Sequence, residues 1–170
     1  MIIGVISDSH DNIPTLRKAI EILKQYEVAV LIHLGDISSP FTLRYVVEYP
    51  GKVVIVLGNN DGDKALLKEI ALKAGAVLRE GIFVFSISDR KLLLMHGFGS
   101  KDNTLEIVNA LASSQNFNAV LYGHTHEVDL RYLGNTLVLN PGELCGYLSG
   151  KQTLAVLDLR TMKAEILEIS

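Results

Sequence analysis

Five apolar, strand-like runs of this chain each end in a polar segment that carries Asp, His or Asn. The five segments are, in order, Asp8-Ser9-His10, Gly35-Asp36, Gly58-Asn59-Asn60-Asp61, His96-Gly97 and Gly123-His124-Thr125-His126. Ligands of open α/β sheets bind beyond the carboxyl ends of the strands, so we expect these distant segments to meet at one edge. Nitrogen and oxygen donors in this number are typical of transition-metal sites. The pattern therefore predicts an α/β fold that holds two metal ions.

Length and composition agree with one compact enzyme domain that spans residues 1–170. Hydrophobic residues make up 48% of the chain, enough to bury a substantial core. The net charge is −3 with both signs mixed along the chain, so no basic patch indicates a nucleic-acid partner. No apolar stretch approaches the ~18 residues of a membrane span. Without a secretory signal, and with the single Cys145 unable to form an internal disulfide, the protein is expected to be cytoplasmic.

Strand-like and helix-like periods alternate along the first half, and strands dominate the second half. Strands are predicted where nearly every residue is apolar or where apolar residues alternate, and helices where apolar residues recur at i, i+3, i+4 and i+7. The predicted strands are 1–7, 28–34, 52–57, 82–87, 91–95, 119–122, 128–133, 136–139, 154–159 and 164–169. A helix is predicted after a cap at Asn12, a short helix starts at Ser39-Pro40, and two more are predicted at 63–74 and 103–113. This order predicts two packed sheets with helices on their outer faces.

Taken singly, each polar segment has a structural explanation as well as a metal-binding one. Asp8 and His10 are two residues apart, so on an extended backbone they face one side and can chelate one ion, or they can cap the next helix. The His-x-His segment at 124–126 repeats this spacing. Asp36 also fits a routine helix cap, and residues 58–62 fit a turn. The occurrence of all five segments at strand ends favours a dinuclear metal site.

In this order the five segments resemble the motifs of the calcineurin-like metallophosphoesterases. The short chain and the segment Asn140-Pro141-Gly142 are similar to the small microbial phosphodiesterase branch of that family. The resemblance implies a four-layer α-β-β-α sandwich, in which helices flank two mixed sheets. It also implies seven metal ligands, which are Asp8, His10 and His126 for a first ion, Asn59, His96 and His124 for a second, and Asp36 as the bridge.

The resemblance implies a dinuclear-metal-dependent phosphoesterase with small phosphodiesters as the expected substrates. A water that bridges two divalent ions has its pKa lowered toward neutrality, so hydroxide can attack phosphorus without a protein nucleophile. Cys145 is accordingly interpreted as a structural thiol. Manganese is the first expectation for the ions, and nickel, iron and zinc stay open because His, Asp and Asn ligands suit all of them.

One position departs from the wider family, in which a histidine follows the ligand Asn and can protonate the leaving group. Asn60 stands there, and we expect its amide to contact a substrate phosphate oxygen without acting as a general acid. His33 and Asp61 are interpreted as braces for the ligands, with ordinary core and turn roles as the alternative.

A non-catalytic scaffold, similar to the retromer subunit of this family, is the alternative function. Scaffold relatives have lost site histidines, whereas every expected ligand position here holds a competent residue, so the sequence favours an enzyme. Self-association as a homodimer or homotetramer is an open expectation, because small members of this branch often self-associate.

Overall fold

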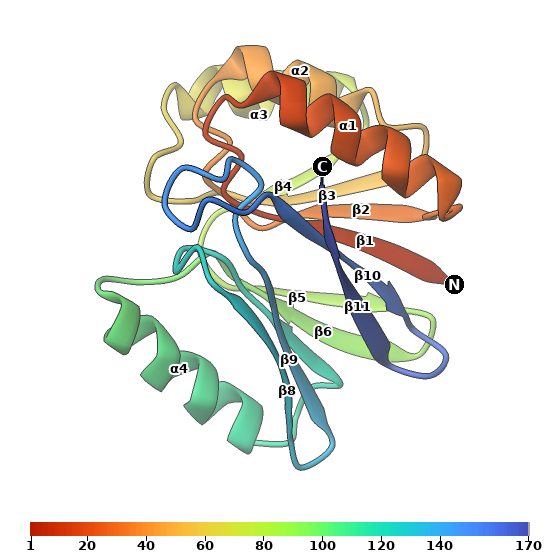
Figure 1. Cartoon of the computed structure of the whole chain (residues 1–170), viewed down its shortest axis with the longest axis vertical. Helices are drawn as coiled ribbons and strands as arrows, with labels where there is room; N and C mark the ends of the chain where they lie inside the picture. Colours follow the sequence, from red (N-terminus) through yellow and green to blue (C-terminus); the bar gives the residue numbers. More distant parts are fainter. Residues whose placement is uncertain (170) are drawn as a thin grey trace.

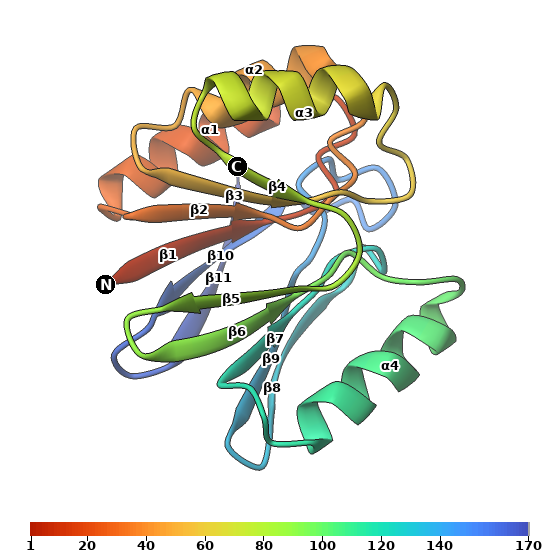
Figure 2. The same cartoon turned by 180° about the vertical axis from the view of Figure 1, so that it is seen from behind.

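The computed structural model describes residues 1–169, and within this range the chain forms four helices and eleven strands. The strands make two mixed sheets that pack face to face. Three helices cover the outer face of one sheet and one helix covers the outer face of the other, as Figure 1 and Figure 2 show from opposite sides. The four-layer α-β-β-α sandwich implied by the resemblance is confirmed.

The first sheet has six strands in the order β11-β10-β1-β2-β3-β4, with β1 to β4 parallel and β10 and β11 antiparallel to their neighbours. Its strands are β1 (Ile2–Ile6), β2 (Val30–His33), β3 (Lys52–Val56), β4 (Val77–Arg79), β10 (Thr153–Asp158) and β11 (Lys163–Glu168). The helices that link the parallel strands are α1 (Ile13–Gln25), α2 (Pro40–Val47) and α3 (Lys64–Lys73).

The second sheet has five strands in the order β5-β6-β7-β9-β8, with β6, β7 and β9 parallel and the two outer strands antiparallel. Its strands are β5 (Phe83–Ile87), β6 (Arg90–Leu94), β7 (Ala119–Leu121), β8 (Val128–Leu133) and β9 (Thr136–Pro141). The helix α4 (Lys101–Ser113) links β6 to β7. No helix within residues 1–169 combines the length and the apolar character needed to cross a membrane.

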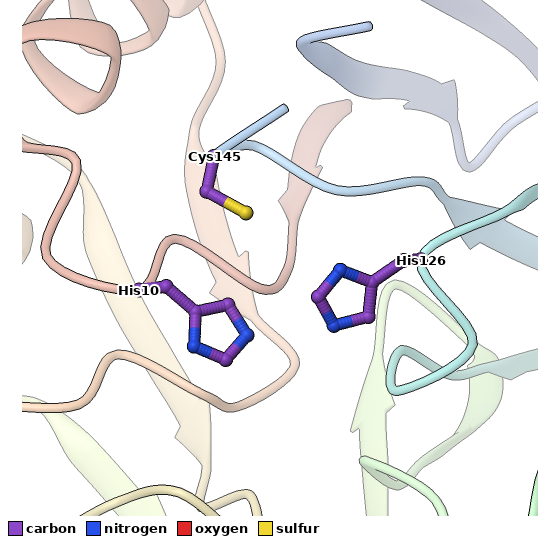
Figure 3. A group of neighbouring side chains, drawn as sticks. All are labelled: His10, His126 and Cys145. Carbon is purple, nitrogen blue, oxygen red and sulfur yellow. The ribbon is translucent and has the colours of Figure 1, made fainter. Parts of the chain in front are cut away.

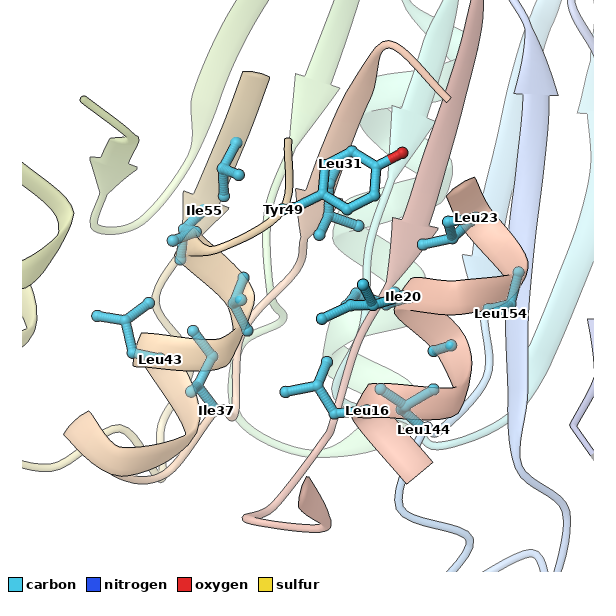
Figure 4. Packing of buried hydrophobic residues seen from close by; sticks show 14 of the residues in the cluster. Leu16, Ile20, Leu23, Leu31, Ile37, Leu43, Tyr49, Ile55, Leu144 and Leu154 are labelled. Carbon is cyan, nitrogen blue, oxygen red and sulfur yellow. The ribbon is translucent and has the colours of Figure 1, made fainter. Parts of the chain in front are cut away.

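Strands β1 to β3 are buried on both faces, which explains their almost continuous apolar sequences. On the outer face, Leu31 and Ile55 lie in one apolar cluster with Leu16 of α1 and Leu43 of α2 (Figure 4). On the inner face, side chains such as Val5 meet the second sheet in a separate apolar layer. The core therefore fixes the positions of these strands and of the loops that leave them.

The structure adds one strand to the sequence prediction, and several predicted ends shift by one or two residues. The strand β4 was not predicted, because Val77–Arg79 is a three-residue edge strand whose side chains are half-buried or exposed, too short for an apolar period. The helix α4 begins at Lys101 rather than at 103, because the side chain of Ser100 caps it by accepting from the Asn103 N–H. The predicted cap at Asn12 is confirmed by its bond from the Thr15 N–H.

Both sheets direct carboxyl ends of parallel strands to the same end of the sandwich. In Figure 1 the strands β1 and β6 run toward that end, at the left of the view. The loop between β9 and β10 also lies there, because the N–H groups of Leu144 and Cys145 donate to the carbonyls of Ser7 and Asp8. Loops that leave both sheets therefore meet at one place.

Candidate metal centre

Four of the sequence-predicted ligands form a tight group at this end of the sandwich. One ligand atom from each of Asp8, His10, Asp36 and His126 lies within 4.8 Å of those of the others. The Nε2 atom of His126 is 3.3 Å from Asp8 Oδ1, and the Nε2 atom of His10 is 3.5 Å from Asp36 Oδ2. The loops after β1, β2 and β7 contribute these side chains.

The other three predicted ligands lie beside this group. The Nε2 atom of His96 is 3.4 Å from Asp36 Oδ2 and 3.1 Å from Asn59 Oδ1. The ring of His124 meets the ring of His96 edge-on, with 5.0 Å between centroids. The structure thus brings all seven predicted residues together, and Asp36 lies against one histidine of each predicted ligand set, His10 and His96.

Five of these seven residues have a backbone conformation that L-residues rarely adopt. Their φ angles are positive, at 52° for Asp8, 39° for His10, 56° for Asp36, 70° for His124 and 58° for His126. Such a conformation costs of order 1 kcal/mol or more for each residue. Strain of this kind is typical of functional sites, where the surrounding fold holds side chains in position.

Glycine residues let the loops approach one another closely. A Cβ atom on Gly58 would clash with Asp36 Oδ1, and one on Gly123 would clash with the hydroxyl of Ser7 and approach Asp8 Oδ2 to 3.0 Å. The glycines that precede Asn59 and His124 are therefore required by this packing.

The electrostatics of the site fit cations. Asp8 is fully buried, and burial raises the pKa of its carboxyl group above the usual value. Among the described residues, Asp8 Oδ1 and His10 Nε2 are buried atoms with no hydrogen-bond partner. Burial also acts to raise the pKa of Asp36, but hydrogen bonds and charge from His96, with bonds from Asn60, hold it well below the usual range. Unpartnered carboxylate and imidazole atoms that face each other match the ligands of divalent transition metals.

The Asp8→Asn variant is expected to be more stable than the wild type when metal-free. The amide oxygen can still accept from the His124 N–H, which is 3.1 Å from Asp8 Oδ2, and the amide nitrogen can donate to His126 Nε2. Removing a buried charge whose Oδ1 has no hydrogen-bond partner should raise the unfolding free energy by about 1–3 kcal/mol. Denaturant titration of chelator-treated protein measures this change. A less stable Asp8→Asn protein would contradict this expectation. Asp36→Asn should have the opposite effect and lower the stability near neutral pH, because a carboxylate whose pKa is lowered by folding stabilises the folded state above that pKa.

His33 and Asp61 lie where braces were predicted. His33 is fully buried, and burial lowers its pKa to about 3, so the ring is neutral. Its Nδ1 accepts from the Gly35 N–H, which leaves Nε2–H to donate to the Ser9 hydroxyl. The carboxylate of Asp61 accepts from the N–H groups of Asp36, Ser38 and Gly58. The two side chains hold the loops after β1, β2 and β3 against one another.

Glu143 is part of the site, although the sequence analysis did not include it. The side chain is fully buried, and its Oε2 lies 2.7 Å from His126 Nδ1. It also accepts from the N–H groups of Leu148 and Ser149. Burial acts to raise its pKa, but these bonds, from His126 first, lower the pKa to about 2. The carboxylate therefore fixes the His126 ring, with Nε2 directed at Asp8.

The thiol of Cys145 faces the same histidines, as Figure 3 shows. One ligand atom from each of His10, His126 and Cys145 lies within 4.8 Å of the others. The thiol donates to Glu143 Oε2 over 3.1 Å, and burial raises its pKa to about 12. Because the thiolate is the nucleophilic form, a thiol protonated at neutral pH agrees with a structural role.

Comparisons with known proteins agree with this geometry. Residues 1–162 match the model of the calcineurin-like phosphoesterase superfamily domain. A phosphodiesterase from Methanocaldococcus jannaschii is 37% identical over 171 aligned positions, which cover 99% of this chain and 98% of that protein. The solved structure of a novel archaeal phosphodiesterase matches with a TM-score of 0.91 at 33% identity, over 99% of this chain and 100% of that one.

A more distant structure shares the fold. Wild-type Vps29 from Entamoeba histolytica, solved in complex with zinc, matches over 99% of each chain with a TM-score of 0.70. At 19% identity this likeness concerns the fold alone. The family model, the sequence relative and the archaeal structure together show that the chain belongs to the calcineurin-like phosphoesterase superfamily.

Proposed function

We propose that the protein, as one domain of residues 1–170, is a phosphodiesterase that uses two divalent metal ions to hydrolyse a small phosphodiester. The observation that carries this proposal is the position of Asp36, whose Oδ2 is 3.5 Å from His10 Nε2 and 3.4 Å from His96 Nε2. A carboxylate between two groups of nitrogen and oxygen donors is the arrangement of a bridged two-metal site. The phosphodiesterase relative at 37% identity supports the same reaction.

The proposed ligands are Asp8, His10 and His126 for the first ion, Asn59, His96 and His124 for the second, and Asp36 for both. Two divalent ions, when bound, lower the pKa of water to supply hydroxide for attack on phosphorus and neutralise charge on the phosphate group. Manganese is the proposed ion, with nickel, iron and zinc as alternatives, because a set of imidazole, carboxylate and amide ligands suits each of them.

In three of the proposed histidine ligands, one ring nitrogen is hydrogen-bonded to a group outside the ligand set, which leaves the other nitrogen for the metal ion. The Nδ1 atom of His126 binds Glu143 and that of His96 binds the carbonyl of Leu34, so Nε2 is the nitrogen of each ring that faces the other proposed ligands. His124 is reversed, because its Nε2 binds the Gly99 carbonyl over 2.8 Å. We propose that His124 binds through Nδ1, since a histidine ligand donates its other ring N–H to an oxygen acceptor.

Asn60 lies at the entrance of the site. Its backbone N–H donates to Asp36 Oδ1 over 2.8 Å, its side-chain amide donates to Oδ2 over 2.7 Å, and the residue is exposed. We propose that this amide also contacts a phosphate oxygen of the bound substrate. An amide cannot supply a proton near neutral pH, so the leaving oxygen receives no acid catalysis from this position.

A non-catalytic scaffold is the alternative function. A strained backbone at five ligand residues costs free energy and has no use in a scaffold. In a metal site it brings the ligand side chains together. The enzyme is therefore the function that the geometry supports better.

A chromogenic assay tests the proposal. Bis(p-nitrophenyl) phosphate and p-nitrophenyl phosphate are supplied to chelator-treated protein before and after addition of manganese, nickel, iron or zinc. We expect no nitrophenol without metal, recovery with at least one ion, and faster turnover of the diester. Full activity in a preparation shown by elemental analysis to lack metal contradicts the two-metal proposal. A protein that binds two ions and hydrolyses neither ester supports the scaffold.

The Glu143→Gln variant tests the orientation of His126. A Gln amide offers one acceptor atom, so it cannot serve His126 Nδ1–H and the N–H groups of Leu148 and Ser149 together. We expect manganese to bind about 10–100-fold more weakly, as when the carboxylate behind a histidine ligand is removed. Calorimetric titration measures the affinity, and activity at saturating metal should recover. Glu106→Gln, exposed on α4, is the control, and equal affinities in the two variants would contradict the assignment.

A further inference from the structure

The second sheet ends in an unprotected strand. β8 is one of the two edge strands, with β5 at the other edge, and spans Val128–Leu133, six residues without Pro, Gly or Lys. Natural edge strands are commonly shortened or carry Lys or Pro, because unpaired N–H and C=O groups recruit other strands. The first sheet follows this rule, since its edge strand β4 has three residues and its other edge, β11, carries exposed Lys163, Glu165 and Glu168.

The backbone of β8 is suited to accept another strand. β8 pairs with β9 through a hairpin in which Leu133 lies opposite Thr136 across a two-residue turn. Residues that flank such a turn bond to each other, and hydrogen-bonded and free pairs then alternate along the strands. The N–H and C=O groups of Val128, Leu130 and Tyr132 therefore point away from β9. Pro141, which has no N–H, lies opposite Val128 and agrees with this assignment.

The two faces of β8 carry different chemistry. Val128, Leu130 and Tyr132 alternate on the face toward the first sheet and remain 48%, 39% and 51% exposed. Asp129 and Arg131 lie on the α4 face, where Arg131 Nε is 2.9 Å from Asp129 Oδ1. The edge thus combines an exposed apolar row with two opposite charges.

From this edge we infer that β8 pairs with β8 of a second copy of the chain, antiparallel about a two-fold axis at Leu130. This register places Asp129 opposite Arg131 of the second copy, and Val128 opposite Tyr132 of that copy. Opposite-charge pairs and pairs of aromatic with β-branched residues are favourable across strands. The pairing joins two five-stranded sheets into one and brings both apolar rows into contact on one face.

Charge complementarity selects this register over its neighbours. In an antiparallel pair, residues that lie opposite each other are on the same face of the sheet. The nearest alternative registers are therefore those in which the two-fold axis passes through Asp129 or through Arg131. A shift in one direction brings Asp129 opposite itself, and a shift in the other brings Arg131 opposite itself. Like charges directly opposite are destabilising. Only the register centred on Leu130 pairs both charges with their opposites.

Disulfide trapping tests the register. A Cys at position 130 lies opposite itself with Cα atoms about 5.5 Å apart, within the range of a disulfide, whereas two copies of a Cys at 128 lie far apart. We expect oxidation to link Leu130→Cys into dimers and to leave Val128→Cys largely unlinked. The native Cys145 is buried and does not interfere. Equal crosslinking of the two variants, or none in either, overturns the register.

Sedimentation velocity from micromolar to millimolar protein tests the dimer itself. We expect a concentration-dependent dimer whose Kd rises about tenfold or more in Arg131→Glu, because both interchain pairs become repulsive. The double variant Asp129→Arg, Arg131→Asp restores complementarity and should regain most of the affinity. Arg160→Glu, on an exposed turn of the β10–β11 hairpin, is the control for net charge. A monomer throughout, or a dimer that Arg131→Glu leaves unchanged, overturns the inference.

Discussion

The Asp36→Asn variant is expected to lose activity by about 10³-fold or more. The Oδ2 atom of Asp36 lies 3.5 Å from His10 Nε2 and 3.4 Å from His96 Nε2, so this carboxylate would contribute to both proposed metal sites. Two metal ions stabilise transition-state charge by several kcal/mol, and each 1.36 kcal/mol corresponds to a factor of ten in rate. A neutral amide cannot bridge two cations, so both ions should bind more weakly and the rate should fall at any realistic metal concentration.

The matched control for this variant is Asp158→Asn. Asp158 is a carboxylate on the β10–β11 hairpin, where it accepts from the Arg160 N–H and the Thr161 hydroxyl, away from the metal centre. Its substitution should leave the rate of diester hydrolysis unchanged. Rates are compared with metal content from elemental analysis, and circular dichroism establishes that both variants are folded. An Asp36→Asn protein that retains two ions and normal turnover would show that Asp36 does not bridge them.

The fold could be predicted from the sequence wherever burial leaves a pattern. β1, β2 and β3 are covered on both faces, so their sequences are almost continuously apolar, and α1 covers them with one apolar stripe. The strand β4 left no such pattern, because it has three residues at an edge and gains its structure from β3. Tertiary contact alone makes it a strand.

The site could be predicted in part for a similar reason. The seven proposed ligands follow strand ends, and a sheet brings its strand ends together. Glu143 could not be found this way, because it lies in the loop after β9 and reaches His126 only in the folded chain. Its sequence neighbours Leu144 and Cys145 give no sign of a buried carboxylate. The bond from Asn60 to Asp36 is likewise a product of packing between two loops.

The Asn60→His variant is expected to change how the rate depends on the leaving group. In the wild type the leaving oxygen departs without an acid at position 60, so rates should fall steeply as the pKa of the leaving alcohol rises. Nitrophenyl esters should then turn over far faster than alkyl esters. The backbone N–H of residue 60 donates to Asp36 Oδ1, and this bond survives substitution of the side chain. A histidine can therefore occupy the position without removing that contact.

An imidazole at position 60 would introduce a group with an unperturbed pKa of about 6.5 beside the phosphate. General acids contribute about 10²–10⁴-fold, so hydrolysis of alkyl esters should rise by up to that factor while nitrophenyl esters change little. Asn60→Gln, which keeps an amide that cannot titrate, is the control and should retain the steep dependence. Rates for a series of aryl and alkyl esters, measured at matched metal content, give the slope for each protein. Equal slopes in all three proteins would show that position 60 does not face the leaving group.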